Sequence, residues 1–536
     1  MTSMTANRRL ILKSTVALAA VAAGGGALAA CDLKSEAPVS DVAPLVTTTY
    51  GKVRGRLEGG IATFKGVRYG ADTSLTRFQP PRPPEPWTGT LDAASFGNSA
   101  PQPPASDGGG LFRSWRPDPP LPTGEDCLFL NVWTPAADTK KRPVLVWFHG
   151  GSFSTGSGSS LAYDGVRLAQ RGDVVVVTVN HRLNQFGYLN LAGYGAPFED
   201  SGAVGMLDLV LSLEWIRDNI AGFGGDPGNV MIFGESGGGW KVCTLMAMDS
   251  ARGLFHRAVV QSGPRINHAT RDVSAKAADE LVAKLGLTKD TVREILSKTV
   301  SEIQEAARGI AAAGSGPVLD GRSIVRDPFS PDAPPQSAAV PLLIGCNRTE
   351  GASLTPADSP NHALTWETLP AAIKTAFPAL SEMAIIDLYR SKHPDIEPPE
   401  LFFMATSDNT FLRNSVTIAD RKADQGGAPV FFYMLDWETP VMGGRRYVPH
   451  ALDIGMVFDN VAKSESMSGP PGPEAQAIAD QMSESWLAFA RTGVPSHPGL
   501  PDWPAYTSQR RSMMVFRSDP GVEVDIRAME RAVTAG

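Results

Sequence analysis

One stretch limits the fold of this chain more than any other: an apolar run that ends in a glycine-flanked serine and continues into a second apolar run. The run NVMIF (229–233) leads into Gly234-Glu235-Ser236-Gly237-Gly238, which fits the pattern G-x-S-x-G and is its only match in the chain. In this pattern the serine stands on a strained turn between a strand and a helix, and the glycines let neighbouring backbone pass without Cβ clashes. An isolated match is as easily a glycine-rich loop, so the interpretation depends on the flanking strand and on the helix-like run KVCTLMAM (241–248).

Further apolar runs indicate a sheet of buried parallel strands. Residues 143–150 (PVLVWFHG) and 173–180 (DVVVVTVN) have the near-continuous apolar character of such strands. Residues 207–223, which lie between the second run and the serine turn, have helical spacing, so strand, helix and strand follow one another. We find no repeat and no second composition regime. We therefore expect an α/β fold with one large domain over residues 47–536, in which helices flank a central, mostly parallel, twisted sheet.

Two later segments predict amphipathic helices. Residues 275–287 and 473–493 place apolar side chains at helical spacing, and Gly493 is a typical helix stop. We expect such helices to form insertions around the sheet. Residues 101–110 (PQPPASDGGG) instead have the composition of a surface loop.

The first thirty residues have the organisation of an export signal. A basic segment with adjacent Arg8 and Arg9 precedes an uncharged run, rich in Ala and Gly, that is too short and too weakly apolar for a membrane span. The paired arginines resemble a twin-arginine export signal. The run ends in Leu28-Ala29-Ala30-Cys31, which resembles the lipobox of bacterial lipoproteins. We therefore expect residues 1–30 to be removed and Cys31 to be lipidated.

A lipid on Cys31 would anchor the protein to the membrane in the bacterial cell envelope, facing the periplasm. Residues 31–46 are polar and contain prolines, so we expect them to form a tether. The alternative is cleavage after Ala27-Leu28-Ala29, an A-x-A site, which would release a soluble secreted protein.

Charge and motif content exclude several classes of partner. The net charge is -7 and the sequence pI about 5.7, without a basic stripe, so we expect no nucleic-acid partner and no membrane contact other than the lipid anchor. The sequence contains no H-E-x-x-H, P-loop or G-x-G-x-x-G pattern. We therefore expect no metal and no cofactor. The cysteines beyond Cys31 can all be free thiols.

A nucleophilic serine requires a base, and the candidates are the histidines in the last third of the chain. Alpha/beta enzymes with this serine motif place serine, acid and histidine in that chain order. Four of the eight histidines follow Ile344, namely His362, His393, His450 and His497. His450 lies in a loop that leads into an apolar run, whereas the other three have the surroundings of surface loops. Spacing alone favours His450 only modestly.

The acid and the oxyanion donors also have candidates at predicted strand ends. Glu350 lies just past the strand-like start of VPLLIGCNRTEG (340–351), where active sites collect in open α/β sheets. WFHGGSF (147–153) follows a strand and brings two glycines together, which suits backbone N–H groups that bind a developing negative charge. Local sequence alone favours a surface glutamate at position 350, and it allows an ordinary strand-ending turn at 147–153.

Together these residues resemble the type-B carboxylesterase/lipase family, which includes cholinesterases and bacterial para-nitrobenzyl esterases. FGGDPGNVMIFGESGG (223–238) resembles the family's serine signature along its whole length. EDCLFLNVWTP (125–135) resembles its second signature, with Phe129 where tyrosine or threonine is usual. The resemblance covers nearly all of the mature chain. It implies an α/β-hydrolase fold for the catalytic domain over 47–536, with helical insertions over the active site.

The resemblance implies a role for each candidate residue. Ser236 matches the nucleophile, Glu350 the triad acid and His450 the base. HGGSF (149–153) matches the family's H-G-G-G-F loop. The implied oxyanion donors are the backbone N–H groups of Gly151, Ser152 and Gly237.

Departures from the family pattern bear on the site. Ser152 replaces the third glycine of the loop and is expected to stiffen it. Gly237 stands where alanine is common and is expected to loosen the serine turn. The family often pairs the cysteine matching Cys127 with an upstream cysteine, but Ala100 stands at that position, so we predict a free thiol at Cys127.

Four further residues differ from the family or accompany its site. His181 replaces a usual tyrosine, and we expect a buried structural role for it. Trp240 and Lys241 are unusual just after the serine turn; Trp240 either lines the acyl pocket or packs the helix. Ser262 matches a family serine near the triad, and we expect a supporting role.

The sequence thus predicts a serine hydrolase that cleaves small-molecule carboxylic esters through an acyl-enzyme, with a Ser-His-Glu triad. One alternative is hydrolysis of amides, carbamates or lactones on the same triad. The other is a binding protein on this fold, since some members of the family are adhesion proteins that lack the catalytic serine. All three triad positions are occupied here, which favours the enzyme.

Overall fold

The computed structural model describes residues 43–103, 110–310 and 316–535. The predicted export signal and Cys31 lie outside this part, as does most of the tether. Leu45 and Val46, which the sequence assigns to the tether, form the start of β1 (Leu45–Thr47), because Val46 is buried and pairs with the next strand.

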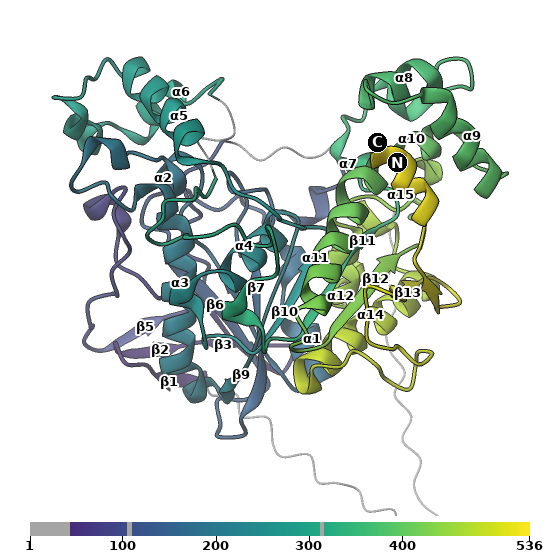
Figure 1. The fold of residues 1–536 in the computed structure, drawn as a ribbon. Coiled ribbons are helices and arrows are strands. Elements are labelled where there is room, and N and C mark those ends of the chain that lie inside the picture. Colours follow the sequence, from purple (N-terminus) through teal and green to yellow (C-terminus); the bar gives the residue numbers. More distant parts are fainter. Residues whose placement is uncertain (1–42, 104–109, 311–315, 536) are drawn as a thin grey trace, which may run out of the picture. The chain divides into compact units, whose positions relative to one another are not determined.

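A mixed sheet of eleven strands forms the centre of the described domain (Figure 1). The order is β14-β13-β12-β11-β10-β9-β7-β8-β6-β4-β3, and the strands from β13 to β8 run parallel. Its strands are β3 (Arg56–Glu58), β4 (Ile61–Arg68), β6 (Phe129–Thr134), β7 (Arg142–Phe148), β8 (Val175–Val179), β9 (Gly225–Glu235), β10 (Arg257–Gln261), β11 (Leu342–Asn347), β12 (Val430–Leu435), β13 (Ser512–Phe516) and β14 (Gly521–Val524). A smaller sheet joins β1 to β2 (Lys52–Arg54) and β5 (Thr90–Asp92).

The central strands are buried on both faces. In β7, Val144, Val146 and Phe148 enter one apolar core, whereas Leu145 and Trp147 enter the other. Because successive side chains point to opposite faces and both faces are covered, such strands read as continuous apolar runs. The predicted mostly parallel sheet is therefore confirmed, with β7 lying between β8 and β9.

Helices cover both faces of the sheet. The core that contains Val146 includes apolar residues of α3 (Val204–Asn219), α4 (Gly237–Met246) and α11 (Arg413–Asp424). The opposite core includes residues of α1 (Val166–Gly172), α12 (Leu452–Val457) and α14 (Pro473–Thr492). The remaining α-helices are α2 (Asn184–Tyr188), α5 (Arg271–Lys284), α6 (Val300–Ala306), α7 (Gly351–Leu354), α8 (Leu369–Ala376), α9 (Glu382–Lys392), α10 (Pro398–Ser407), α13 (Glu465–Ser468) and α15 (Ala528–Ala535).

Some of these helices pack outside the two sheet cores. Helices α5 and α6 share one small apolar cluster, and α8, α9 and α10 share another, as expected for helical insertions. In the part of the chain that the structure describes, no helix is long and apolar enough to cross a membrane.

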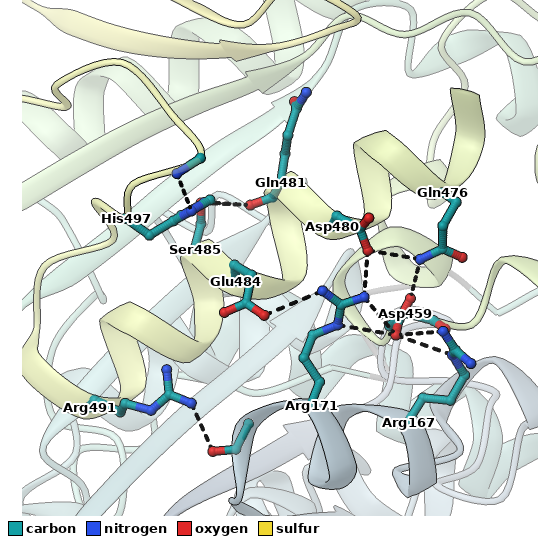
Figure 2. Close-up of polar contacts among 12 residues, drawn as sticks. Arg167, Arg171, Asp459, Gln476, Asp480, Gln481, Glu484, Ser485, Arg491 and His497 are labelled. Atoms are coloured by element: carbon teal, nitrogen blue, oxygen red, sulfur yellow. Dashed lines mark hydrogen bonds and ion pairs between the residues drawn. The ribbon is translucent and has the colours of Figure 1, made fainter. Parts of the chain in front are cut away.

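Charged side chains fix α14 to α1 (Figure 2). Arg171 of α1 lies 2.5 Å from Asp480 and 3.3 Å from Glu484, both of α14. It also lies 3.2 Å from Asp459, which Arg167 approaches to 2.9 Å. We call these five residues the α1–α14 network. Asp459 follows α12 closely, so the network also holds the end of that helix.

Candidate active site

Ser236 occupies the turn between β9 and α4. Its φ of 57° and ψ of -123° are rare for a residue with a side chain, and its N–H donates to the carbonyl of Gln261 at 2.8 Å. Helix α4 begins at the next residue, Gly237. The strand, strained turn and helix that the serine pattern predicts are therefore present.

The glycines after Ser236 allow close contact with the segment that follows β7. A Cβ on Gly238 would lie 2.0 Å from the carbonyl oxygen of Phe148. A Cβ on Gly237 would lie 2.2 Å from the carbonyl oxygen and 2.5 Å from the nitrogen of Ser152. The missing side chain of Gly237 is what lets α4 pack against Ser152. That Gly237 loosens the turn stays a prediction.

His450 and Glu350, far apart in the sequence, meet beside this turn. Nδ1 of His450 lies 2.5 Å from Oε2 of Glu350, and both side chains are buried. The other carboxylate oxygen, Oε1, accepts from the Ser262 hydroxyl at 2.6 Å and from the Asn347 N–H at 2.7 Å. These bonds fix the carboxylate, so Ser262 has the supporting contact that was expected.

The second ring nitrogen of His450 faces Glu235, the residue before Ser236. Nε2 lies 3.1 Å from Oε1 of Glu235, but that oxygen has no aligned hydrogen bond among the described residues. In the same part of the chain, no hydrogen bond joins Ser236 to His450. Such bonds often form only when substrate binds. Glu235 was overlooked in the sequence because it is the variable position of G-x-S-x-G.

Burial and neighbouring charges shift the pKa of both His450 and Glu235. Burial alone would lower the pKa of His450, but Glu235 and Glu350 outweigh burial and raise it to about 9. Burial raises the pKa of Glu235 to about 8; His450 lowers that pKa, while Asp453 and Glu350 raise it further. His450 and Glu235 therefore titrate as a coupled pair.

The turn after β7 places backbone donors beside Ser236. A Cβ on Gly150 would lie 3.4 Å from the Cβ of Ser236. Gly151 and Ser152 follow with φ of 79° and 56°, are exposed, and donate no backbone hydrogen bond to any described residue. Gly237, the first residue of α4, likewise has no intrahelical acceptor for its N–H. Three unused N–H groups thus border the serine. We call residues 149–152 the oxyanion turn.

Comparison with known proteins identifies the family of the chain. Residues 42–534 match the model of the carboxylesterase family. The chain belongs to that family. It adopts the α/β-hydrolase fold and is a carboxylic ester hydrolase.

The relatives of this carboxylesterase include bacterial enzymes that align with it over nearly their whole length. Para-nitrobenzyl esterase of Bacillus subtilis is 34% identical over 91% of this chain and 97% of its own. Phenmedipham hydrolase of Pseudarthrobacter oxydans is 31% identical over 90% of this chain and 96% of its own. The solved structure of a Geobacillus stearothermophilus carboxylesterase is 37% identical, covers 91% of this chain and 99% of its own, and superposes with a TM-score of 0.79.

The structure shows what surrounds His181 and Trp240, two residues that depart from the family pattern. His181 is buried, as expected, with its ring centroid 4.8 Å from that of His149, and burial lowers its pKa well below the usual value. Trp240 is half-buried and packs against Phe153 at 5.8 Å and beneath the Arg265 guanidinium at 5.2 Å. A packing role for Trp240 is therefore present.

Among the described residues, the thiols of the carboxylesterase form no disulfide and its possible metal ligands form no metal-binding group. Cys127 is free and buried, as predicted, and so are Cys243 and Cys346. Across 43–103, 110–310 and 316–535, no three His, Cys, Asp or Glu side chains are grouped so as to hold a metal ion.

Lys241 is the other residue of the site whose role the sequence did not reveal. Its side chain is fully buried, and its Nζ donates to the carbonyls of His149 at 2.8 Å and Ser152 at 2.9 Å. The available signal was a lysine inside the apolar run 241–248. Together, Glu235, Lys241, Glu350 and His450 form what we call the strand-end cluster.

Proposed function

We propose that this carboxylesterase cleaves esters through an acyl-enzyme, with Ser236 as nucleophile, His450 as general base and Glu350 as the residue that orients the base. The observation that carries the proposal is the buried contact of His450 with Glu350 beside a serine on a strained turn at a strand end. Glu350 accepts at Nδ1, which keeps the proton there and leaves Nε2 as the basic atom.

In the first half-reaction, Nε2 of His450 takes the hydroxyl proton of Ser236 while Oγ bonds to the ester carbonyl carbon. The resulting tetrahedral oxyanion accepts hydrogen bonds from the backbone N–H groups of Gly151, Ser152 and Gly237. When the intermediate collapses, the carbon–oxygen bond to the alcohol breaks. The alcohol leaves with the proton that His450 carries.

In the second half-reaction, water gives a proton to His450 and attacks the acyl carbon of the ester formed with Ser236. The second tetrahedral intermediate uses the same oxyanion donors. Its collapse releases the carboxylic acid and returns the proton to Oγ. The chain's own residues therefore supply each proton transfer of the cycle.

The test is hydrolysis of para-nitrophenyl acetate, butyrate and octanoate by the protein and by Ser236→Ala. We expect activity to vanish in the variant while its circular dichroism and melting temperature are retained. A serine-directed phosphonate should label the protein at Ser236 only. A folded protein without activity or labelling would reject the triad and favour a binding function.

The same triad could act on other acyl compounds, so substrate class needs its own comparison. Matched esters, amides, carbamates and lactones that share one acyl group should be compared by kcat/KM. Ester hydrolysis is expected to be fastest. A larger kcat/KM on any other class would replace the ester proposal while leaving the triad intact.

We also propose that the protein is exported and held in the bacterial cell envelope by a lipid on Cys31. The support is the charged start, the apolar run and the LAAC sequence that ends it. Fractionation of cells that express the protein should place it with membranes, and Cys31→Ala should move it to the soluble fraction. Mass spectrometry of a mature protein beginning near Ala30 without lipid would favour the secreted alternative.

A further inference from the structure

Lys241 lies one helical turn after Gly237, and its ammonium group reaches the oxyanion turn. Nζ donates to the carbonyl of His149 at one end of that turn and to the carbonyl of Ser152 at the other. It also lies 5.6 Å from the ring centroid of Phe153, the next residue. Helical spacing places Gly237 and Lys241 on one face of α4, so both residues of that face contact the same turn.

The position of this lysine is unfavourable for folding alone. Its side chain is fully buried, and among the described residues it has no carboxylate partner. Burial lowers its pKa to about 7. A buried cation that only carbonyls solvate is less stable than a well-packed apolar side chain of similar volume. An apolar residue would therefore satisfy the packing requirement better, which points to another reason for the charge.

The oxyanion turn needs such support because of its conformation. Ser152 has φ of 56°, which is unfavourable for a residue with a Cβ, and both Gly151 and Ser152 are exposed. The two hydrogen bonds from Lys241 fix the carbonyls of the first and last residues of the turn. These carbonyls belong to the peptide units on either side of the two units that carry the Gly151 and Ser152 N–H groups, so anchoring both ends limits how the two inner units can rotate.

We propose that Lys241 is a positioning residue that holds the oxyanion turn so that the N–H groups of Gly151 and Ser152 point at the tetrahedral intermediate. The inference rests on the proposed function and deepens it. This positioning effect is larger in the transition state than in the bound ester, so it acts on kcat rather than on KM.

The experiment compares Lys241→Met with a matched variant, Lys422→Met. Lys422 is also buried, and its Nζ also donates to two backbone carbonyls, those of Ser337 and Ala338, at 2.9 Å each. It lies on α11, away from the oxyanion turn. Both substitutions remove a buried ammonium and its hydrogen bonds, so both should destabilise the fold, and only the first should affect the reaction.

We expect Lys241→Met to lower kcat on para-nitrophenyl butyrate about 10- to 100-fold, less than the loss of a whole oxyanion donor. KM should change less than about threefold. Binding of a trifluoromethyl ketone, which forms a tetrahedral adduct with the serine, should weaken by the same factor as kcat. Active-site titration with a phosphonate normalises all rates to folded enzyme. Lys422→Met should keep the kcat of the unchanged protein.

Other results would overturn the proposal. A folded Lys241→Met with unchanged kcat, or with a raised KM alone, would make Lys241 structural or substrate-binding. Lys241→Gln is a second variant that keeps N–H donors without the charge. Its kcat should lie between that of Lys241→Met and that of the unchanged protein. If neither variant folds while Lys422→Met does, Lys241 is a folding residue and the proposal fails. Ser236→Ala separates the cases: activity in that variant would reject the proposed function itself.

Discussion

The α1–α14 network (Figure 2) and the strand-end cluster are both groups of charged side chains, but they are built on opposite principles. In the network, Arg171 has three carboxylate neighbours. Burial lowers its pKa, but the paired carboxylates outweigh burial and raise it. In the cluster, the polar partners of Lys241 are carbonyls, and burial lowers its pKa. Burial also raises the pKa of Glu235, although the neighbouring His450 opposes the shift, so both pKa values move toward the neutral form.

The α1–α14 network holds charges that stabilise the fold, whereas the strand-end cluster holds charges retained for chemistry. A paired network whose side chains, apart from the buried Asp459, are partly exposed contributes modestly to the free energy of unfolding, and its members can be exchanged without an effect on the reaction. A buried group whose charged form is disfavoured lowers stability, and such groups collect at active sites. Four substitutions test this contrast, in order of decreasing effect.

Glu350→Gln should have the largest effect. The amide nitrogen would donate to Nδ1 of His450, so the ring proton would move to Nε2 and the base would be lost. We expect kcat to fall about 10³- to 10⁴-fold, with an unchanged melting temperature. Glu484→Gln, in the network, is the isosteric control and should keep full activity. More than a tenth of the original kcat in Glu350→Gln would remove this carboxylate from the triad.

Gly237→Ala comes next. The added methyl would enter the space of the Ser152 backbone, so the oxyanion turn must move away from Ser236. We expect kcat to fall roughly 10²-fold, the effect of a misplaced oxyanion donor. Gly193→Ala is a suitable control, because a Cβ there meets nothing within 4 Å. The measurement is steady-state kinetics on para-nitrophenyl butyrate. Full activity of Gly237→Ala would show that the added methyl does not displace the oxyanion turn.

Glu235→Gln should change pH dependence more than maximal rate. The base acts in its neutral form, so activity rises with pH through the pKa of His450, which Glu235 helps to raise. Without this carboxylate that pKa falls, and the acidic limb of the kcat/KM profile should move to lower pH by about one unit. A limb that stays in place or moves to higher pH would show that Glu235 does not act on His450.

Arg171→Met should have the smallest effect. Asp459 would keep its contact with Arg167, and the other carboxylates are partly exposed. We expect the free energy of unfolding to fall by about 1 kcal/mol or less, with kcat unchanged. The difference from the unchanged protein should shrink as salt is added. A loss of kcat at constant stability would show that the network also supports the site.

The elements that the sequence predicted are those with a strong local signal. Strand β8 lies within its predicted apolar run, and β7 and the second half of β9 coincide with theirs, although β9 already begins at Gly225. Helix α14 ends before Gly493, whose φ of 78° suits a helix stop. Helix α5 starts four residues before its predicted segment, at Arg271. The sheet order was beyond the sequence, because pairing of β7 with both β8 and β9 depends on contacts between distant segments.

In the site, too, residues with a local sequence signal could be predicted and contacts between distant segments could not. Ser236, Glu350 and His450 could be singled out because each follows a recognisable run or motif, and the structure brings the last two into contact. The contacts of Glu235 and Lys241 could not be predicted, because they join residues of one segment to backbone or side chains far along the chain. The packing of Gly237 against Ser152 likewise depends on a tertiary approach that composition does not encode.

The three buried thiols have a practical consequence for how the domain is made. Burial raises the pKa of Cys127, Cys243 and Cys346, so each is held as the unreactive thiol. The described structure contains no cross-link that an oxidising compartment would have to supply. We therefore expect the described domain to fold without a disulfide-forming step, and thiol reagents have no accessible cysteine in the described residues to attack.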